Sequence, residues 1–429
     1  MLNPVFSIAH LREMIPVFYN VMYKLLETLQ KEAKNGPTEI DLLEWMSRAA
    51  LELIGQGGLG YSFDPLTSKA VPHPYITAIK GIGPAGMKIF LPARYLLPHL
   101  VKIGTPRMRG IIAKWIPWQP LHDAHDISYV LHNVSVDIFE SKKRALSEGD
   151  EAVAKQVGQG KDLLSILIRE NMKASSADRL PEEEVLGQMS KKLTPPLVLG
   201  RCRTFIFAAT DTTSSALSRI FHLLVLHPDV QDKLRSELET ARDEVGGRDL
   251  TYDELVGLPY LDAICRETLR LHPPVTRVSR CTTQDVMLSL SKPIKGIDGQ
   301  EIPAVAVPKN TTVTIGIMAC NRDPEIWGPD AEEWRPERWL EPLPESVARA
   351  HLPGVYSNLM TFIGGSRACI GFKFSQLEMK VVLSLLIPKF TFSPSKQEIF
   401  WRMGGIAQPT VGSHSNPNAQ LPIIMELIQ

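Results

Sequence analysis

The segment with the clearest chemical potential lies near the C-terminal end, where a cysteine is set among glycines and beside an arginine. Its sequence is Phe362-Ile-Gly-Gly365-Ser-Arg367-Ala-Cys369-Ile-Gly371, and it leads into an apolar stretch with helical spacing. Glycines allow positive φ and close approach of the backbone to a flat ligand. A thiol near a helix N-terminus and an arginine is stabilised as a thiolate, which is a strong donor to iron. The alternative is that Cys369 is a small buried apolar residue, but the fixed spacing of the segment favours a ligand.

A second segment combines charges of opposite sign on one predicted helical face. Glu267 and Arg270 lie three residues apart within an amphipathic stretch, 261–271, that ends at a Pro-Pro pair. Taken alone, they could be an ordinary surface ion pair, which contributes little to stability. Arg280 follows the Pro-Pro turn and could equally be a solvated loop arginine. Further on, Arg338 precedes Trp339 in the run Arg-Pro-Glu-Arg-Trp.

A third segment, 205–217, is an apolar helical stretch interrupted by Thr210, Asp211 and Thr212. Such residues compete with the helix backbone for hydrogen bonds, so their presence there is locally unfavourable. Local rules tend to fail at functional sites, and an acid beside an alcohol can relay protons. A helix N-cap at Thr210 or Asp211 is the alternative, but apolar residues precede the pair as well as follow it.

The C-terminal segment resembles the haem-binding loop of the cytochrome P450 family, Phe-x-x-Gly-x-Arg-x-Cys-x-Gly. The match falls on Phe362, Gly365, Arg367, Cys369 and Gly371. The resemblance implies that the cofactor is haem b (iron protoporphyrin IX) and that Cys369 is the axial ligand of its iron. It also implies that Arg367 faces a haem propionate and that Phe362 packs over the sulfur, where it excludes water.

The other two segments extend the resemblance. In the family, the helical Glu–Arg pair and a second arginine form a buried cluster that braces the haem loop, which assigns structural roles to Glu267, Arg270 and Arg338. Arg280 stands at the family's spacing for a second propionate partner.

The resemblance also assigns the proton relay to Asp211 and Thr212. Two departures from the family pattern are Trp339, where phenylalanine is usual, and Ala209, where glycine is usual. The added methyl group of Ala209 could narrow the substrate pocket.

The elements that must position these residues are mostly helical. Helical periodicity covers 11–34, 39–54, 123–146, 162–170 and 229–245, whereas 281–313 and 390–428 have the composition of short strands and turns. We therefore predict a mainly α fold with a small β region, the cytochrome P450 fold, in which a long central helix lies over the haem. Since no linker or repeat divides the 429 residues, we expect a single haem-thiolate domain over 1–429.

The composition of the chain limits the cellular compartment and the kinds of partner that we expect for it. The chain has 47 Lys and Arg and 47 Asp and Glu, which gives no footprint for nucleic acid. Its five widely spaced cysteines argue against a disulfide framework or a zinc site and for a reducing compartment. No signal peptide and no transmembrane segment is apparent in this chain. The apolar run 89–101 is too short to span a bilayer; the resemblance places it in the roof of the substrate channel, where it can contact a membrane surface, while ordinary helix packing is the alternative.

Two features depart from a typical family member. The chain opens at a point that corresponds to the interior of the family, so we expect that it lacks the N-terminal helices and part of the first sheet and represents a truncated gene model or fragment. Adjacent prolines in 191–203 would break the start of the 205–217 helix, and this segment is interpreted as an insertion or a retained intron.

The predicted function is a haem-thiolate monooxygenase of the microsomal, fungal type. It would use O₂ and electrons from NADPH-cytochrome P450 reductase to oxidise an apolar small molecule, with a terpenoid of secondary metabolism preferred over a fatty acid or steroid. Lys373 and Lys380 would offer positive charge for reductase docking. A full-length form is expected at the cytosolic face of the endoplasmic reticulum membrane. Two alternatives remain: a non-functional truncated member, and a member that rearranges or dehydrates its substrate without O₂.

Overall fold

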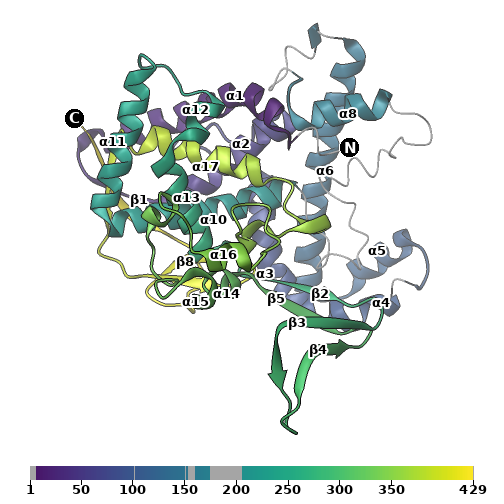
Figure 1. The fold of residues 1–429 in the computed structure, drawn as a ribbon. Coiled ribbons are helices and arrows are strands. Elements are labelled where there is room, and N and C mark those ends of the chain that lie inside the picture. Colours follow the sequence, from purple (N-terminus) through teal and green to yellow (C-terminus); the bar gives the residue numbers. More distant parts are fainter. Residues whose placement is uncertain (1–5, 101, 150, 153–159, 174–204, 429) are drawn as a thin grey trace. The chain divides into compact units, whose positions relative to one another are not determined.

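The computed structural model describes residues 6–100, 102–149, 151–152, 160–173 and 205–428 (Figure 1). The chain divides into two compact units. The first unit comprises Met1–Cys265, Ile370–Trp401 and Pro409–Gln429, and the second comprises Arg266–Cys369 and Arg402–Gln408. The predicted insertion, 191–203, lies outside the described residues.

The first unit is dominated by helices. They are α1 (Ile8–Glu32), α2 (Leu42–Leu53), α3 (Pro74–Tyr95), α4 (Leu97–Leu100), α5 (Pro106–Trp115), α6 (Gln119–Glu148), α8 (Leu163–Lys173), α10 (Phe205–Leu226), α11 (Pro228–Glu244), α12 (Tyr252–Gly257) and α17 (Phe372–Leu386). A π-helical turn, η3 (Ile54–Leu59), extends α2, and α13 (Pro259–Leu271) continues from this unit into the second.

The core of the first unit lies where α1, α2, α10 and α17 pack against one another. Phe18 of α1 meets Phe374 of α17 edge-on, with 5.0 Å between ring centroids. Phe221 of α10 makes a similar contact with Phe392 of β6 (Phe390–Pro394), at 4.9 Å. Edge-to-face pairs of this kind add to the stabilisation from apolar burial. The polar segment of α10 is therefore carried by a well-packed helix.

A three-stranded antiparallel sheet closes the first unit, in the order β1 (Thr38–Asp41), β9 (Pro422–Leu427) and β6. Ile40 of β1 lies opposite Ile423 of β9. This pairing explains why the helix predicted over 39–54 begins only at Leu42. Residues 39–41 belong to β1 and pair with β9, a strand that is distant in sequence. The other helices predicted from periodicity are present, with ends that differ by a few residues.

The second unit contains short strands, short helices and turns. Its elements are β2 (Arg277–Cys281), β3 (Val286–Lys295), β4 (Glu301–Val307), β5 (Thr312–Gly316), α14 (Ile317–Asn321), α15 (Pro324–Trp327), η4 (Pro336–Trp339), α16 (Glu345–Arg349), η5 (Met360–Phe362) and η6 (Gly365–Arg367). Strand β2 pairs antiparallel with β5, and β3 with β4. Strands β7 (Ile399–Met403) and β8 (Ala407–Val411) form a further two-stranded sheet. The fold is thus mainly helical with a small β region, as predicted.

Residues 89–100 of the apolar run form the end of α3, which continues through Pro92 to Tyr95, followed by α4; residue 101 lies outside the described residues. None of the helices in the described part of the chain is long and apolar enough to traverse a bilayer.

Candidate functional site

The cysteine loop of the second unit is folded back on itself by backbone hydrogen bonds. The N–H of Cys369 donates to the carbonyl of Phe362 at 2.8 Å, and the N–H of Ala368 donates to the carbonyl of Gly365 at 3.1 Å. The side chain of Cys369 is exposed. The loop therefore holds the cysteine backbone in place at the surface of the second unit.

Two positions in this loop constrain the backbone strongly. A Cβ on Gly364 would lie 1.4 Å from the carbonyl oxygen of Pro353, so only glycine fits there. Ile363 has φ +55, a conformation that β-branched residues rarely adopt. Two hydrogen bonds retain it: its N–H donates to Met360 and its carbonyl accepts from Val355. Strained residues of this kind gather at ligand sites, and the sequence motif, which leaves position 363 unspecified, did not reveal this one.

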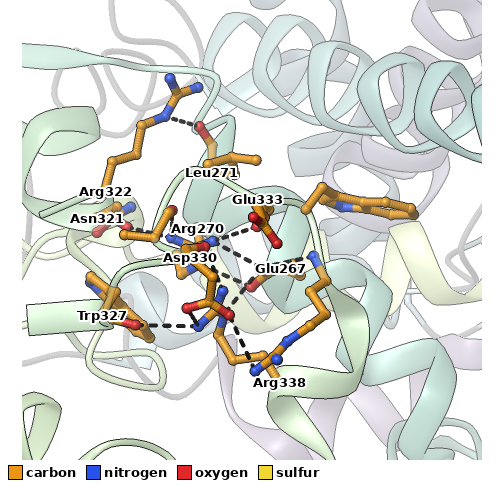
Figure 2. Close-up of polar contacts among 12 residues, drawn as sticks. Glu267, Arg270, Leu271, Asn321, Arg322, Trp327, Asp330, Glu333 and Arg338 are labelled. Atoms are coloured by element: carbon orange, nitrogen blue, oxygen red, sulfur yellow. Dashed lines mark hydrogen bonds and ion pairs between the residues drawn. The ribbon is translucent and has the colours of Figure 1, made fainter. Parts of the chain in front are cut away.

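Figure 2 shows a buried ion cluster around the carboxylate of Glu267, which is fully buried. Arg270 donates to both oxygens, at 2.9 Å from Nε and 2.8 Å from Nη2, and Arg338 Nε donates to Oε1 at 3.2 Å. The backbone N–H of Arg335 and the indole N–H of Trp339 add bonds at 3.1 and 2.9 Å. Such dense hydrogen bonding is what allows a charge to be buried.

The two arginines of the cluster have further partners. Arg338 Nη1 donates to Asp330 at 3.0 Å, and this contact lowers the pKa of the Asp330 carboxyl. Arg270 donates to the backbone carbonyls of Asn321, Ala331 and Glu333. Contacts of the cluster join α13 to Asn321 of α14 and to residues 331–339, so the cluster holds together parts of the second unit that are distant in sequence.

The side-chain amide of Asn321, the last residue of α14, contacts the segment before the cysteine loop. The side chain of Asn321 accepts from the N–H of Met360 at 2.8 Å and donates to the hydroxyl of Thr361 at 2.9 Å. Thr361 in turn donates to the carbonyl of Leu269 at 2.7 Å. Asn321 and Thr361 were not among the predicted site residues, because a lone asparagine and threonine carry no pattern that marks them.

Asp211 and Thr212 occupy the interior of α10 in the first unit, on the same helix as the buried Thr213. Burial raises the pKa of the Asp211 carboxyl to about 6, and Lys80 of α3 opposes that rise. The Thr212 hydroxyl donates to the carbonyl of Ala208 at 2.6 Å. The joint action of these residues with Cys369 in catalysis stays a prediction.

The two predicted propionate partners lie in the second unit. Arg280 of β2 is partly buried and donates to the carbonyl of its neighbour Ser279 at 2.9 Å, while Arg367 of η6 is exposed. Within the described residues, neither guanidinium has a carboxylate partner. Both are therefore available to an anionic ligand.

One expectation about surface charge is wrong. Lys380 is not exposed: its ammonium group is fully buried in α17, with an ion pair to Asp262 at 2.8 Å and a hydrogen bond to the carbonyl of Val256 at 3.0 Å. The reason is that position 380 lies on the face of α17 that packs against α12. Lys380 therefore cannot steer a partner protein, whereas Lys373 is partly exposed.

The donor set of the loop fits an iron porphyrin. The thiol of Cys369 is exposed, a Cβ built on Gly365 or Gly371 would meet nothing within 4 Å, and Arg280 and Arg367 offer cations for carboxylates. A thiolate suits iron, and haem presents two carboxylates for guanidinium groups. We find no cluster of His, Cys, Asp or Glu able to hold another metal among the residues the structure covers.

Comparison with known proteins identifies the family. The family model for cytochrome P450 matches residues 1–411. Cytochrome P450 monooxygenase 91 of Postia placenta is 53% identical over 99% of this chain and 75% of its own length. The ganoderic acid synthetase of Ganoderma lucidum is 46% identical over 96% of this chain and 74% of its own length.

The comparison of structures agrees on the fold. The crystal structure of a cytochrome P450 superposes with a TM-score of 0.68 at 22% identity, covering 100% of this chain and 77% of that one. With the family model matched over most of the chain and fungal monooxygenases as relatives, this chain belongs to the cytochrome P450 family.

Proposed function

We propose that this chain is a haem-thiolate monooxygenase that oxidises an apolar small molecule with O₂ and electrons from NADPH-cytochrome P450 reductase. The observation that carries the proposal is the exposed Cys369 on a glycine-rich loop, in the same unit as the guanidinium groups of Arg280 and Arg367, which have no carboxylate partner among the described residues. We further propose that the two units act as one catalytic domain.

In this proposal haem b is held by the loop residues and Arg280. Cys369 would supply the thiolate that binds the iron, Arg367 and Arg280 would bind the propionates, and Gly365 and Gly371 would let the ring approach the backbone. Phe362 shields the sulfur from water. When bound, the haem supplies the activation of O₂ and the insertion of oxygen into a C–H bond, while the protein contributes binding and orientation.

The proposed proton donor is Asp211, assisted by Thr212. Because burial raises the pKa of Asp211 to about 6, its carboxyl exchanges a proton readily near neutral pH. The Thr212 hydroxyl has its proton engaged with the carbonyl of Ala208, so its oxygen lone pairs remain to accept a proton from a neighbour. An intact acid–alcohol pair favours a reaction that consumes O₂ and protons over one that rearranges or dehydrates its substrate.

The proposed substrate class is terpenoid. It is supported by one relative, named a ganoderic acid synthetase, that is 46% identical to this chain. A fatty acid or steroid hydroxylase is the alternative within the same chemistry.

We also propose that the region from α3 to α5 contacts a membrane, at the cytosolic face of the endoplasmic reticulum. Residues 65–122 contain no Asp or Glu but eight Lys and Arg. Large apolar side chains are exposed on the same region, among them Leu96, Ile103, Ile111 and Trp115, the last 82% exposed. Exposed apolar groups interspersed with cations suit an anionic lipid surface. Flotation with phosphatidylserine vesicles tests this: binding that survives Ile111→Ser/Trp115→Ser would contradict it.

The test of the main proposal is the carbon monoxide difference spectrum of the reduced protein, expressed with a haem precursor. We expect a red-shifted thiolate-type Soret band that disappears in Cys369→Ala and persists in Cys281→Ala. Cys281 is the matched control because it is also exposed and lies in β2 of the same unit. A chain that takes up no haem, or a band unaffected by Cys369→Ala, would refute the proposal and favour a non-functional member.

With a thiolate band established, the substrate class is tested by binding-induced spectral shifts and by turnover with a reductase. Terpenoids, steroids and fatty acids are compared at equal concentration. Oxidation of terpenoids in preference to the other two is the expected result.

A further inference from the structure

Arg266 lies between two aromatic rings of the second unit. Its guanidinium carbon is 5.6 Å from the ring centre of Trp339 and 5.6 Å from that of Tyr356. A cation this close to an aromatic face is attracted by the ring quadrupole, and tryptophan is the strongest partner. Trp339 belongs to η4, whereas Tyr356 belongs to the segment before η5, so Arg266 links two parts of the chain that are separate in sequence.

On one side, this arrangement is anchored in the ion cluster. The indole N–H of Trp339 donates to Glu267 Oε2 at 2.9 Å, a bond that a phenylalanine at this position could not make. Trp339 also contacts Trp327, with ring centroids 5.8 Å apart. Trp339 is therefore held in place by Glu267 and Trp327, which are both buried.

On the other side, the arrangement leads to the cysteine loop. Tyr356 is buried and meets the ring of Phe362 edge-on, with centroids 5.6 Å apart and planes at 67°. The carbonyl of Phe362 accepts the N–H of Cys369 at 2.8 Å. A continuous series of contacts thus runs from the buried carboxylate of Glu267, through Arg266, to the backbone of Cys369.

We propose that Arg266 is a positioning residue for the thiolate ligand: clamped by Trp339 and Tyr356, it fixes Phe362 and, through it, the orientation of Cys369. This inference rests on the proposed haem-thiolate function. The guanidinium suits the task because its plane can stack on two rings, whereas an ammonium group concentrates its charge at one point. A methionine would fill similar space without the charge.

The experiment compares the reduced carbon monoxide spectra of the haem-loaded wild type, Arg266→Met, Arg266→Lys and Trp339→Phe. The ratio of the red-shifted thiolate band to the band at shorter wavelength is the measured quantity. For Arg266→Met we expect that ratio to fall about fivefold, the effect of losing the partly buried cation–π contacts with both rings, with a smaller fall for Arg266→Lys. The double variant Arg266→Met/Trp339→Phe should fall less than the product of the two single effects, since Trp339→Phe weakens one of the contacts that Arg266→Met removes.

Trp334→Phe is the matched control. Its indole N–H donates to the Thr268 hydroxyl at 3.0 Å, so this change also removes one indole hydrogen bond near the cluster, but not one that involves Arg266. We expect its band ratio to equal that of the wild type. Far-ultraviolet circular dichroism should be the same for all variants.

The outcomes separate the two proposals. A wild type without a red-shifted band refutes the haem-thiolate function itself. A wild type with that band, together with Arg266→Met at the wild-type ratio, refutes only the positioning role. The positioning role is equally wrong if Trp334→Phe or Arg266→Lys lowers the ratio as far as Arg266→Met, or if the effects of Arg266→Met and Trp339→Phe multiply independently.

Discussion

Replacing Glu267 by glutamine tests the ion cluster most directly. The change keeps the size of the side chain, removes its charge and turns an acceptor oxygen into a donor NH₂. Glu267 accepts five hydrogen bonds, three of them from Arg270 and Arg338. In the variant, these guanidinium groups lose the negative charge that compensates their burial.

The expected loss in the free energy of unfolding depends on the contacts that Arg270 and Arg338 keep in the variant. Removing one partner of a buried ion pair costs about 3–5 kcal/mol. Arg338 keeps its contact with Asp330, and Arg270 keeps three backbone carbonyls, so we expect a value at the lower end, about 3 kcal/mol. That is a large part of the roughly 5–15 kcal/mol that typically stabilises a folded protein.

Urea unfolding of the haem-loaded protein, followed by tryptophan fluorescence, measures this cost. Trp327, Trp334 and Trp339 all lie in this region, so the fluorescence reports on its unfolding. A loss of about 3 kcal/mol lowers the midpoint by about 1 M urea. The control is Glu333→Gln, whose side chain is exposed and which contacts Arg270 only through its backbone carbonyl. A midpoint for Glu267→Gln within error of that control would refute the description of the cluster.

Three further predictions concern other parts of the molecule. Because burial raises the Asp211 pKa from 3.8 to about 6, the folded state favours the neutral acid and loses stability as pH rises through this window. Asp211→Asn should therefore be more stable than the wild type by up to about 3 kcal/mol above pH 6, and urea titrations should show that this gain vanishes near pH 4. Gly364→Ala forces a Cβ to within 1.4 Å of a backbone oxygen and should abolish haem uptake measured by absorbance, whereas Gly405→Ala, whose Cβ meets nothing within 4 Å, should not. Lys380→Met removes the buried partner of the Asp262 carboxylate and should lower the free energy of unfolding by about 3 kcal/mol. A urea midpoint equal to that of the wild type would contradict the ion pair.

Much of the fold could be predicted from local patterns in the sequence. The family and the mainly helical architecture predicted from the sequence are confirmed by the family model and by the crystal structure of a relative. Helical periodicity found α1, α6, α8, α11 and α13 because the spacing of apolar residues along one segment depends only on that segment. The start of α2 was missed because Ile40 pairs with Ile423, a partner nearly the whole chain away.

For the site, the sequence by itself determined which residues match a haem-thiolate pattern: the cysteine among its glycines, the acid–alcohol pair of α10 and the Glu267–Arg270 spacing are all short-range features. Their roles in catalysis stay predictions. Only the tertiary structure decided that Lys380 is buried against Asp262, that Ile363 holds positive φ, and that Arg266 lies between Trp339 and Tyr356. The physical reason is that burial and ring contacts depend on which distant segments meet, and no spacing along the chain records such meetings.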